Sequence, residues 1–201
     1  YYFIENYLNY RIFHIRLHTF DSLRSVMNLR DQLLSSEVLE LANDSSSVLG
    51  PGLILNSCIV DSRVPAEYII IAGLTMTGGN FNQHGELKDF HFENANLSNV
   101  IFTGKFIGCD FGEWDDTSTS SIINCDFKDC HLDGVRFLNA DVDTTALPKW
   151  PHFFIRSPEK FNPNIDTQSL PKKLGITLNV YFDEEPDCSA IVGNAQRLAE
   201  E

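Results

Sequence analysis

The chain has 201 residues, 43 % of them hydrophobic and 21 % charged, a balance typical of a folded domain and not of a disordered chain. Its net charge of −13 argues against direct binding to nucleic acid or to an anionic membrane, and it favours a basic protein partner. No stretch approaches the ~20 consecutive apolar residues of a membrane-spanning helix.

Residues 1–52 are predicted to form an N-terminal cap of a strand and a helix. Apolar and polar residues alternate over 13–18, which predicts a short strand. From Asp21, a residue suited to begin a helix, the spacing of apolar residues up to Leu41 predicts an amphipathic helix. The stretch 43–52 is rich in Ser and Gly and is predicted to be a linker or turn. We expect this segment to cover the open end of the domain that follows, because an exposed sheet edge promotes association.

Residues 53–147 are predicted to form a repeat domain. From Gly85 to Leu147 a large apolar residue stands at nearly every fifth position, usually with a small residue two places earlier, and the repeat before this stretch is imperfect. A period of five fits neither a helix, with about 3.6 residues per turn, nor a flat strand, with about 2. It predicts a backbone that turns a corner after each short extended piece, so that four five-residue faces close a square coil. About four such coils would stack at roughly 4.8 Å. Six phenylalanines on this grid are predicted to point inward as an apolar column: Phe92, Phe102, Phe106, Phe111, Phe127 and Phe137.

The cysteines divide into two groups. Four of them occupy small-residue positions of the grid and are predicted to be buried and reduced: Cys58, Cys109, Cys125 and Cys130. Cys188 lies outside the grid and is predicted to be exposed and the first to be labelled. Reduced thiols favour a reducing compartment, so a cytoplasmic location is expected.

Residues 148–201 are predicted to form a C-terminal cap and tail. Four prolines between 148 and 163 are expected to end the repeat. The pattern then predicts a short helix over 168–176 that stops at Gly175, a strand over 177–182 and a last helix over 190–198.

Several of these pieces resemble the pentapeptide-repeat family, whose loose consensus is Ala-Asp/Asn-Leu/Phe followed by two variable residues. The best matches are Ala95-Asn96-Leu97, Cys125-Asp126-Phe127 and Ala140-Asp141-Val142. The resemblance covers 55–147 and is strongest after Leu87. It implies a mainly β fold, a right-handed quadrilateral β-helix, and it carries over no catalytic residues.

One branch of that family protects DNA gyrase by imitating the charge and shape of duplex DNA. This chain is similar to that branch in its acidic solenoid, where acidic residues outnumber basic ones by 12 to 4 from Glu86 to Asp143. A polar loop over 112–121 and a short helix after the repeat are further similarities. The short solenoid and the long segments at both ends depart from it.

The polar loop contains the candidate partner-binding residues Glu113, Trp114, Asp115 and Asp116. Trp114 is flanked by three acids and has two interpretations of equal weight: an interface anchor, or a side chain that covers the wall of the coil. The two aspartates could bind a cation, but a solvated loop is the favoured interpretation. We predict no catalytic residue, metal or cofactor, because the acidic residues are scattered without basic residues beside them.

These observations favour a non-enzymatic protein–protein interaction module with a basic protein partner. The main alternative is a DNA mimic that binds and protects a type II topoisomerase. A second alternative is a scaffold or targeting domain of a larger effector or enzyme. A homodimer formed through a terminal cap is one expected assembly.

Overall fold

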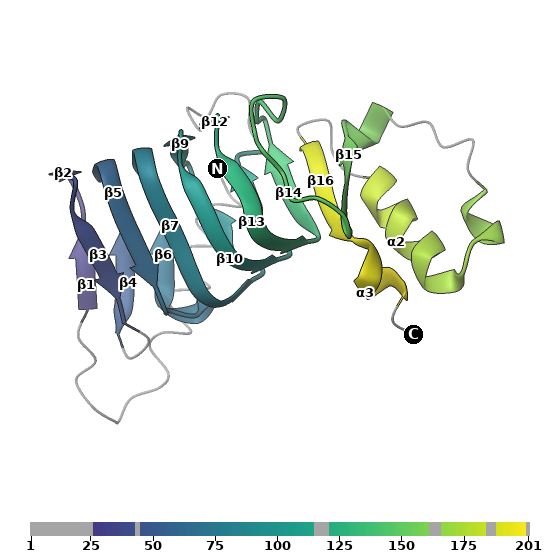
Figure 1. The fold of residues 1–201 in the computed structure, drawn as a ribbon, viewed down its shortest axis with the longest axis horizontal. Coiled ribbons are helices and arrows are strands. Elements are labelled where there is room, and N and C mark those ends of the chain that lie inside the picture. Colours follow the sequence, from purple (N-terminus) through teal and green to yellow (C-terminus); the bar gives the residue numbers. More distant parts are fainter. Residues whose placement is uncertain (1–25, 43–44, 115–120, 161–165, 184–187, 200–201) are drawn as a thin grey trace, which may run out of the picture.

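The computed structural model of this protein describes residues 26–42, 45–114, 121–160, 166–183 and 188–199. The fold is mainly β, and most of its strands stack in parallel to form a β-solenoid of about four coils (Figure 1). The stacked, mainly β architecture predicted from the five-residue pattern is therefore confirmed.

Three rows of parallel strands run along the solenoid, and we call them the first, second and third walls. The first wall contains β1 (Val26–Leu29), β4 (Ser46–Leu49), β6 (Ile69–Ile71), β8 (His91–Phe92), β11 (Asp110–Gly112) and β14 (Val135–Leu138). The second wall contains β2 (Leu33–Ser35), the first parts of β5 (Ile54–Ser62) and β7 (Thr75–Lys88), β9 (Asn96–Ser98) and β12 (Ser121–Ile123). The third wall contains β3 (Val38–Leu41), the later parts of β5 and β7, β10 (Ile101–Ile107) and β13 (Asp126–Asp133).

The repeat of the coil is longer than the predicted four faces of five residues. Through the first four strands of the second wall, paired residues are 21 positions apart, as between Thr77 and Ser98. The next step is 25 positions, from Asn96 to Ser121, because the polar stretch after Gly112 is inserted between β11 and β12.

Corners between the second and third walls are turned by residues in the left-handed conformation. Five residues stacked at this corner have this conformation, with φ between +53° and +65°: Ser36, Ser57, Gly78, Asn99 and Asn124. Gly adopts this conformation at little cost, and Asn tolerates it better than most residues. The corner column is therefore a sequence signal of its own, and it repeats every 21 or 25 residues and not every five.

The core consists of stacked aromatic rings. Phe111 lies between Phe92 and Phe137 along the first wall, with ring centroids 4.3 and 5.6 Å away. Along the third wall, Phe102 stacks on Phe127 at 4.4 Å, and the rings are almost parallel. Edge-to-face contacts join the two columns. All six phenylalanines predicted to point inward are fully buried, so that prediction is confirmed. Five of them form two columns and not one, and Phe106 lies between Leu87 and Leu132 on the third wall.

The predicted N-terminal helix is wrong over its described part. Residues 26–41 form β1, β2 and β3, which pair in register with β4 and β5. Short strands separated by corners place inward residues several positions apart, and this spacing resembles that of an amphipathic helix. Ser46–Leu49 is likewise the strand β4 within the predicted linker 43–52. The predicted strand over 13–18 and its neighbour Asp21 lie outside the described residues.

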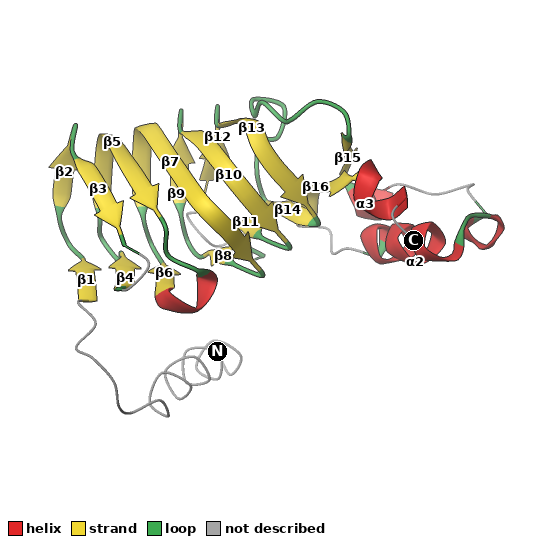
Figure 2. Ribbon diagram, turned by 60° about the horizontal axis from the view of Figure 1, so that its bottom comes forward, coloured by secondary structure: helices red, strands yellow, loops and turns green. Residues whose placement is uncertain are grey.

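Beyond the last coil, an antiparallel unit closes the solenoid. β16 (Cys188–Asn194) pairs on one side with β14 and on the other with β15 (His152–Arg156). Helices α2 (Lys172–Phe182) and α3 (Ala195–Ala199) lie beyond these strands (Figure 2). Three short 3-10 helices, η1 (Ala66–Tyr68), η2 (Pro158–Lys160) and η3 (Thr167–Ser169), complete the described elements.

Two C-terminal segments were predicted with the wrong type of secondary structure. Residues 177–182 belong to α2 and not to a strand, and 190–194 belong to β16 and not to a helix. Gly175 lies inside α2. A Cβ at this position would be only 2.4 Å from the carbonyl oxygen of Thr167. The glycine therefore permits close packing and does not end the helix.

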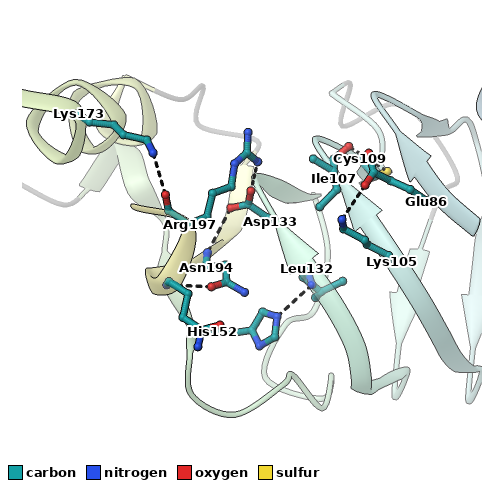
Figure 3. Close-up of polar contacts among 11 residues, drawn as sticks. Glu86, Lys105, Ile107, Cys109, Leu132, Asp133, His152, Lys173, Asn194 and Arg197 are labelled. Carbon is teal, nitrogen blue, oxygen red and sulfur yellow. Dashed lines mark hydrogen bonds and ion pairs between the residues drawn. The ribbon is translucent and has the colours of Figure 1, made fainter. Parts of the chain in front are cut away.

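Polar contacts tie this unit to the last coil (Figure 3). The buried carboxylate of Asp133, at the end of β13, accepts hydrogen bonds from the backbone N–H of Asn194 and from the guanidinium of Arg197. The ammonium of Lys173 in α2 donates to the carbonyl of Arg197 at 2.8 Å. His152 accepts a hydrogen bond from the backbone N–H of Leu132 at 3.2 Å through Nε2.

Candidate interaction surface

Glu113, the first residue of the predicted binding loop, is held against the first wall. Its side chain is 15 % exposed and accepts a hydrogen bond from the backbone N–H of Asn94. Its carbonyl accepts a hydrogen bond from the side chain of Asn139 at 2.7 Å. The Nε2 atom of His91 lies 3.4 Å from the Glu113 carboxylate. This acid is thus engaged within the protein, and its side chain is largely shielded from solvent.

Trp114 packs on the protein surface and is half-buried. Its ring contacts a small cluster that contains Leu138, Tyr181 and Ile191. The guanidinium of Arg136 lies 4.9 Å from the ring centroid. It donates two hydrogen bonds to the carboxylate of Asp110, at 2.7 and 2.9 Å, and these hold it in place. This geometry favours the covering interpretation of Trp114 over the anchor interpretation. The other two predicted residues, Asp115 and Asp116, lie outside the described residues.

Acidic residues of the solenoid are extensively paired. Of the ten described acids between Glu86 and Asp143, five form ion pairs with Lys or Arg: Glu86, Asp110, Asp126, Asp133 and Asp143. The hydrogen bond from Lys105 holds the pKa of the exposed Glu86 carboxyl below its usual value. Earlier along the solenoid, a hydrogen bond from His84 is the main cause of a lowered pKa at Asp61.

The outer surfaces of the second and third walls change character along the solenoid. In the first coils they expose apolar side chains: Leu33 beside Ile54 on the second wall, and Val38 beside Ile59 on the third. Ile101 continues the third-wall row two coils later and is 45 % exposed.

Later coils also carry outward polar side chains on these walls, and these side chains pair with one another. Thr77 with Ser98, Asn96 with Ser121, and Asn82 with Thr103 form hydrogen bonds between coils at 3.0 to 3.3 Å. We call the exposed residues Leu33, Val38, Ile54, Ile59 and Ile101 the apolar row. It was not predicted, although Val38, Ile59 and Ile101 are spaced by multiples of 21 and a search at that period would have found them.

All five cysteines are free and buried. The prediction for Cys58, Cys109, Cys125 and Cys130 is confirmed, whereas the prediction that Cys188 is exposed is wrong. Cys188 is fully buried because β16 continues the sheet of the first wall. Burial raises the pKa of Cys109 and of Cys130 to about 12, and it also raises the pKa of Cys125. These thiols are therefore poor nucleophiles at neutral pH.

The described residues contain neither a group of side chains able to hold a metal ion nor a helix able to span a membrane. No three His, Cys, Asp or Glu side chains within it come together in a way that could hold a metal ion. No helix among these residues has both the length and the apolar composition needed to cross a membrane.

The chain stands apart in comparisons with known proteins. No protein-family model, curated protein or solved structure matches it. The stacked parallel strands are consistent with a repeat β-helix protein, and this conclusion depends on the fold alone.

Proposed function

We propose that this chain is a non-enzymatic protein–protein interaction module, a β-solenoid of the pentapeptide-repeat kind that binds a protein partner through its second and third walls. The observation that carries this proposal is the apolar row. Five large apolar side chains point to solvent from regular strands whose backbone is already paired, so they are not needed for the core. Exposed apolar side chains gathered on one part of a folded domain commonly mark a binding site.

The partner is expected to combine an apolar strip with a basic rim. Glu37 and Glu40 lie next to Val38 on the exposed side of the first coil, and Asp61 lies two residues after Ile59. Together with the net charge of −13, these acids would accelerate association with a positively charged partner at low salt. The five buried, free thiols support a reducing compartment such as the cytoplasm.

The DNA-mimic alternative has weaker support. A mimic needs a continuous stripe of unpaired carboxylates along the solenoid, whereas five acids in the relevant stretch are paired with basic side chains. The role of a scaffold domain in a larger protein is compatible with the same apolar row and would differ only in what is attached to the chain.

The test is affinity capture from a cell extract with the purified chain as bait. Ile59→Lys combined with Ile101→Lys introduces two charges into the apolar row, and we expect the specifically captured proteins to be lost. The matched control is Ile176→Lys with Val180→Lys, which charges two exposed apolar residues on α2. Both double variants should retain thermal stability within about 1 kcal/mol, because the sites are exposed.

Equal capture by the parent and the row variant would contradict the proposal. In that case Trp114→Ala would test the loop. Lost binding with unchanged stability would identify Trp114 as an anchor, whereas lost stability with unchanged binding would agree with its packed position.

A further inference from the structure

His152 joins the C-terminal unit to the last coil through a ring that fits this position in one protonation state (Figure 3). Its Nε2 atom accepts a hydrogen bond from the backbone N–H of Leu132 at 3.2 Å. Its Nδ1 atom lies 3.1 Å from the carbonyl oxygen of Lys149, and because a carbonyl can only accept, Nδ1 must carry the proton. Both contacts therefore require the same species, the neutral imidazole with its proton on Nδ1.

The contact with Leu132 lies where the stack of coils ends. Among the described residues, β13 pairs along one side with β10, and at its beginning Asp126 also forms a bridge with Ala146. His152 belongs to β15, beyond the last coil. Its ring thus supplies to the end of β13 an acceptor of the kind that a further coil would supply.

A second histidine lies against the first. The rings of His131 and His152 meet edge to face, with centroids 5.4 Å apart. Loss of hydration, followed by the repulsion of His152, lowers the pKa of His131 below its usual value of 6.5. The folded protein thus favours neutral His131, so the stability that this preference contributes is complete above pH 6.5 and is lost as the pH falls below that value.

The surroundings of the two rings offer no excess of negative charge. Charged groups on the adjacent elements comprise three acids and three bases: Glu86 on β7, Lys105 on β10, Asp129 and Asp133 on β13, Lys149 before β15, and Arg197 on α3. Two of the acids already have cationic partners, since Glu86 pairs with Lys105 and Asp133 with Arg197. These pairs leave little to stabilise a new positive charge on either ring.

We propose that His131 and His152 form a pH-sensitive latch between the solenoid and its C-terminal unit, closed when His152 is neutral and opened when it is protonated. An imidazolium carries a proton on Nε2, so it would direct one donor at another and lose the hydrogen bond from Leu132. A second charge on His131 would add repulsion across 5.4 Å. The pairing of β16 with β14 involves no imidazole, so opening is confined to the start of β15 and the end of β13.

The closed state is tested by long-range ¹H–¹⁵N NMR of the full chain at pH 7.5. The signals of His152 are assigned by their disappearance in His152→Gln. We expect a neutral ring with its proton on Nδ1. A proton on Nε2 at this pH, in either the neutral or the charged ring, would overturn the proposal.

The opening is tested by amide exchange of Leu132 at pH 7.5 and pH 5.5, expressed as protection factors so that the intrinsic pH dependence is removed. The parent should lose roughly tenfold in protection, because each pH unit below about 6.5 shifts a proton-linked equilibrium by up to tenfold. His152→Gln keeps an acceptor oxygen but does not titrate, so it should lose less than about twofold. The matched control His84→Gln removes an exposed histidine paired with Asp61 and should behave like the parent.

Equal loss of protection in the parent and in His152→Gln, or no loss in the parent, would overturn the proposal. If His152→Gln does not fold, the parent alone decides. Protonation of His152, followed by NMR, and the loss of Leu132 protection should then have the same midpoint pH, and separate midpoints would show that another group opens the contact.

Discussion

The phenylalanines of the two columns contact rings in their own column and in the opposite one. Phe127 illustrates this arrangement, because it stacks on Phe102 at 4.4 Å and meets the edges of Phe111 and Phe137 at 5.0 and 5.3 Å. Burial of one such side chain contributes on the order of 2–3 kcal/mol, and the ring contacts add to this.

We expect Phe127→Ala to lower the free energy of unfolding by about 3–5 kcal/mol, because the coils above and below cannot close the cavity that it leaves. Denaturant unfolding measures this loss. Phe154→Ala is the control, since Phe154 is 45 % exposed, and it should cost less than about 1 kcal/mol. A similarly small cost for Phe127→Ala would show that the ring column contributes little.

Buried thiols should make the protein less stable in alkali. The pKa of Cys109 and of Cys130 is about 12 in the folded protein, against 9.0 when unperturbed, so the unfolded chain loses these protons first. Stability from both groups is therefore complete below about pH 9 and declines as the pH rises toward 12, by up to roughly 1.4 kcal/mol per pH unit for each thiol.

Urea denaturation at pH 8, 9, 10 and 11 checks this expectation. Replacing Cys109 and Cys130 together with Ala removes both titrating groups, so the decline between pH 9 and 11 should be shallower in that variant. Parallel declines would show that these thiols do not determine the alkaline behaviour.

At the level of the elements, corners matter as much as strands. The column from Ser36 to Asn124 lets β5 and β7 pass from one wall to the next without losing their pairing. Asn99 occupies this column at φ +55°, and its backbone N–H donates to the carbonyl of Ile123 at 3.0 Å. Its conformation, more than its side-chain contacts, is what the fold requires.

Asn99→Ala should therefore cost about 1 kcal/mol of unfolding free energy, whereas Asn99→Gly should stay within about 0.5 kcal/mol of the parent. Thermal or denaturant unfolding distinguishes the two. Asn80→Ala on β7 is the control for loss of an amide side chain, because Asn80 is not in the left-handed conformation. Equal effects of Ala and Gly at position 99 would contradict this account.

At the level of the whole molecule, polar contacts attach the C-terminal unit to the last coil of the solenoid. At the C-terminal end, Asp133 is 4 % exposed and connects the last coil to α3, and Lys173 extends the connection to α2. Breaking a buried, hydrogen-bonded charge pair is costly because the remaining polar groups lose their partner.

Asp133→Ala should lower the stability of the C-terminal unit by about 1–3 kcal/mol, since Arg197 is 59 % exposed and can turn to water. Hydrogen exchange is the appropriate measurement. β16 and α2 should exchange faster, and β7 in the interior of the solenoid should be unchanged. Asp141→Ala, at an exposed acid near the same end, should alter neither region. Faster exchange throughout the chain would show that the unit and the solenoid unfold together.

The sequence indicated the candidate binding residues but not the contacts that they make. Glu113 and Trp114 were identified by their charge and size, but sequence could not reveal that Asn94, Asn139 and Arg136 engage them. Those partners come from other coils, up to 26 positions away. The apolar row went unrecognised because its members are dispersed in sequence and join only when the coils stack.

The sequence by itself determined that the chain is a stack of short extended pieces with large inward residues, because a period near five excludes both helix and flat strand. It also identified the buried phenylalanines and four of the buried cysteines. Only the tertiary structure decided that the coils begin before residue 52, that α2 is a helix and that Cys188 is buried. At the edges of a repeat, local propensity is weak, and pairing with the neighbouring coil selects the conformation.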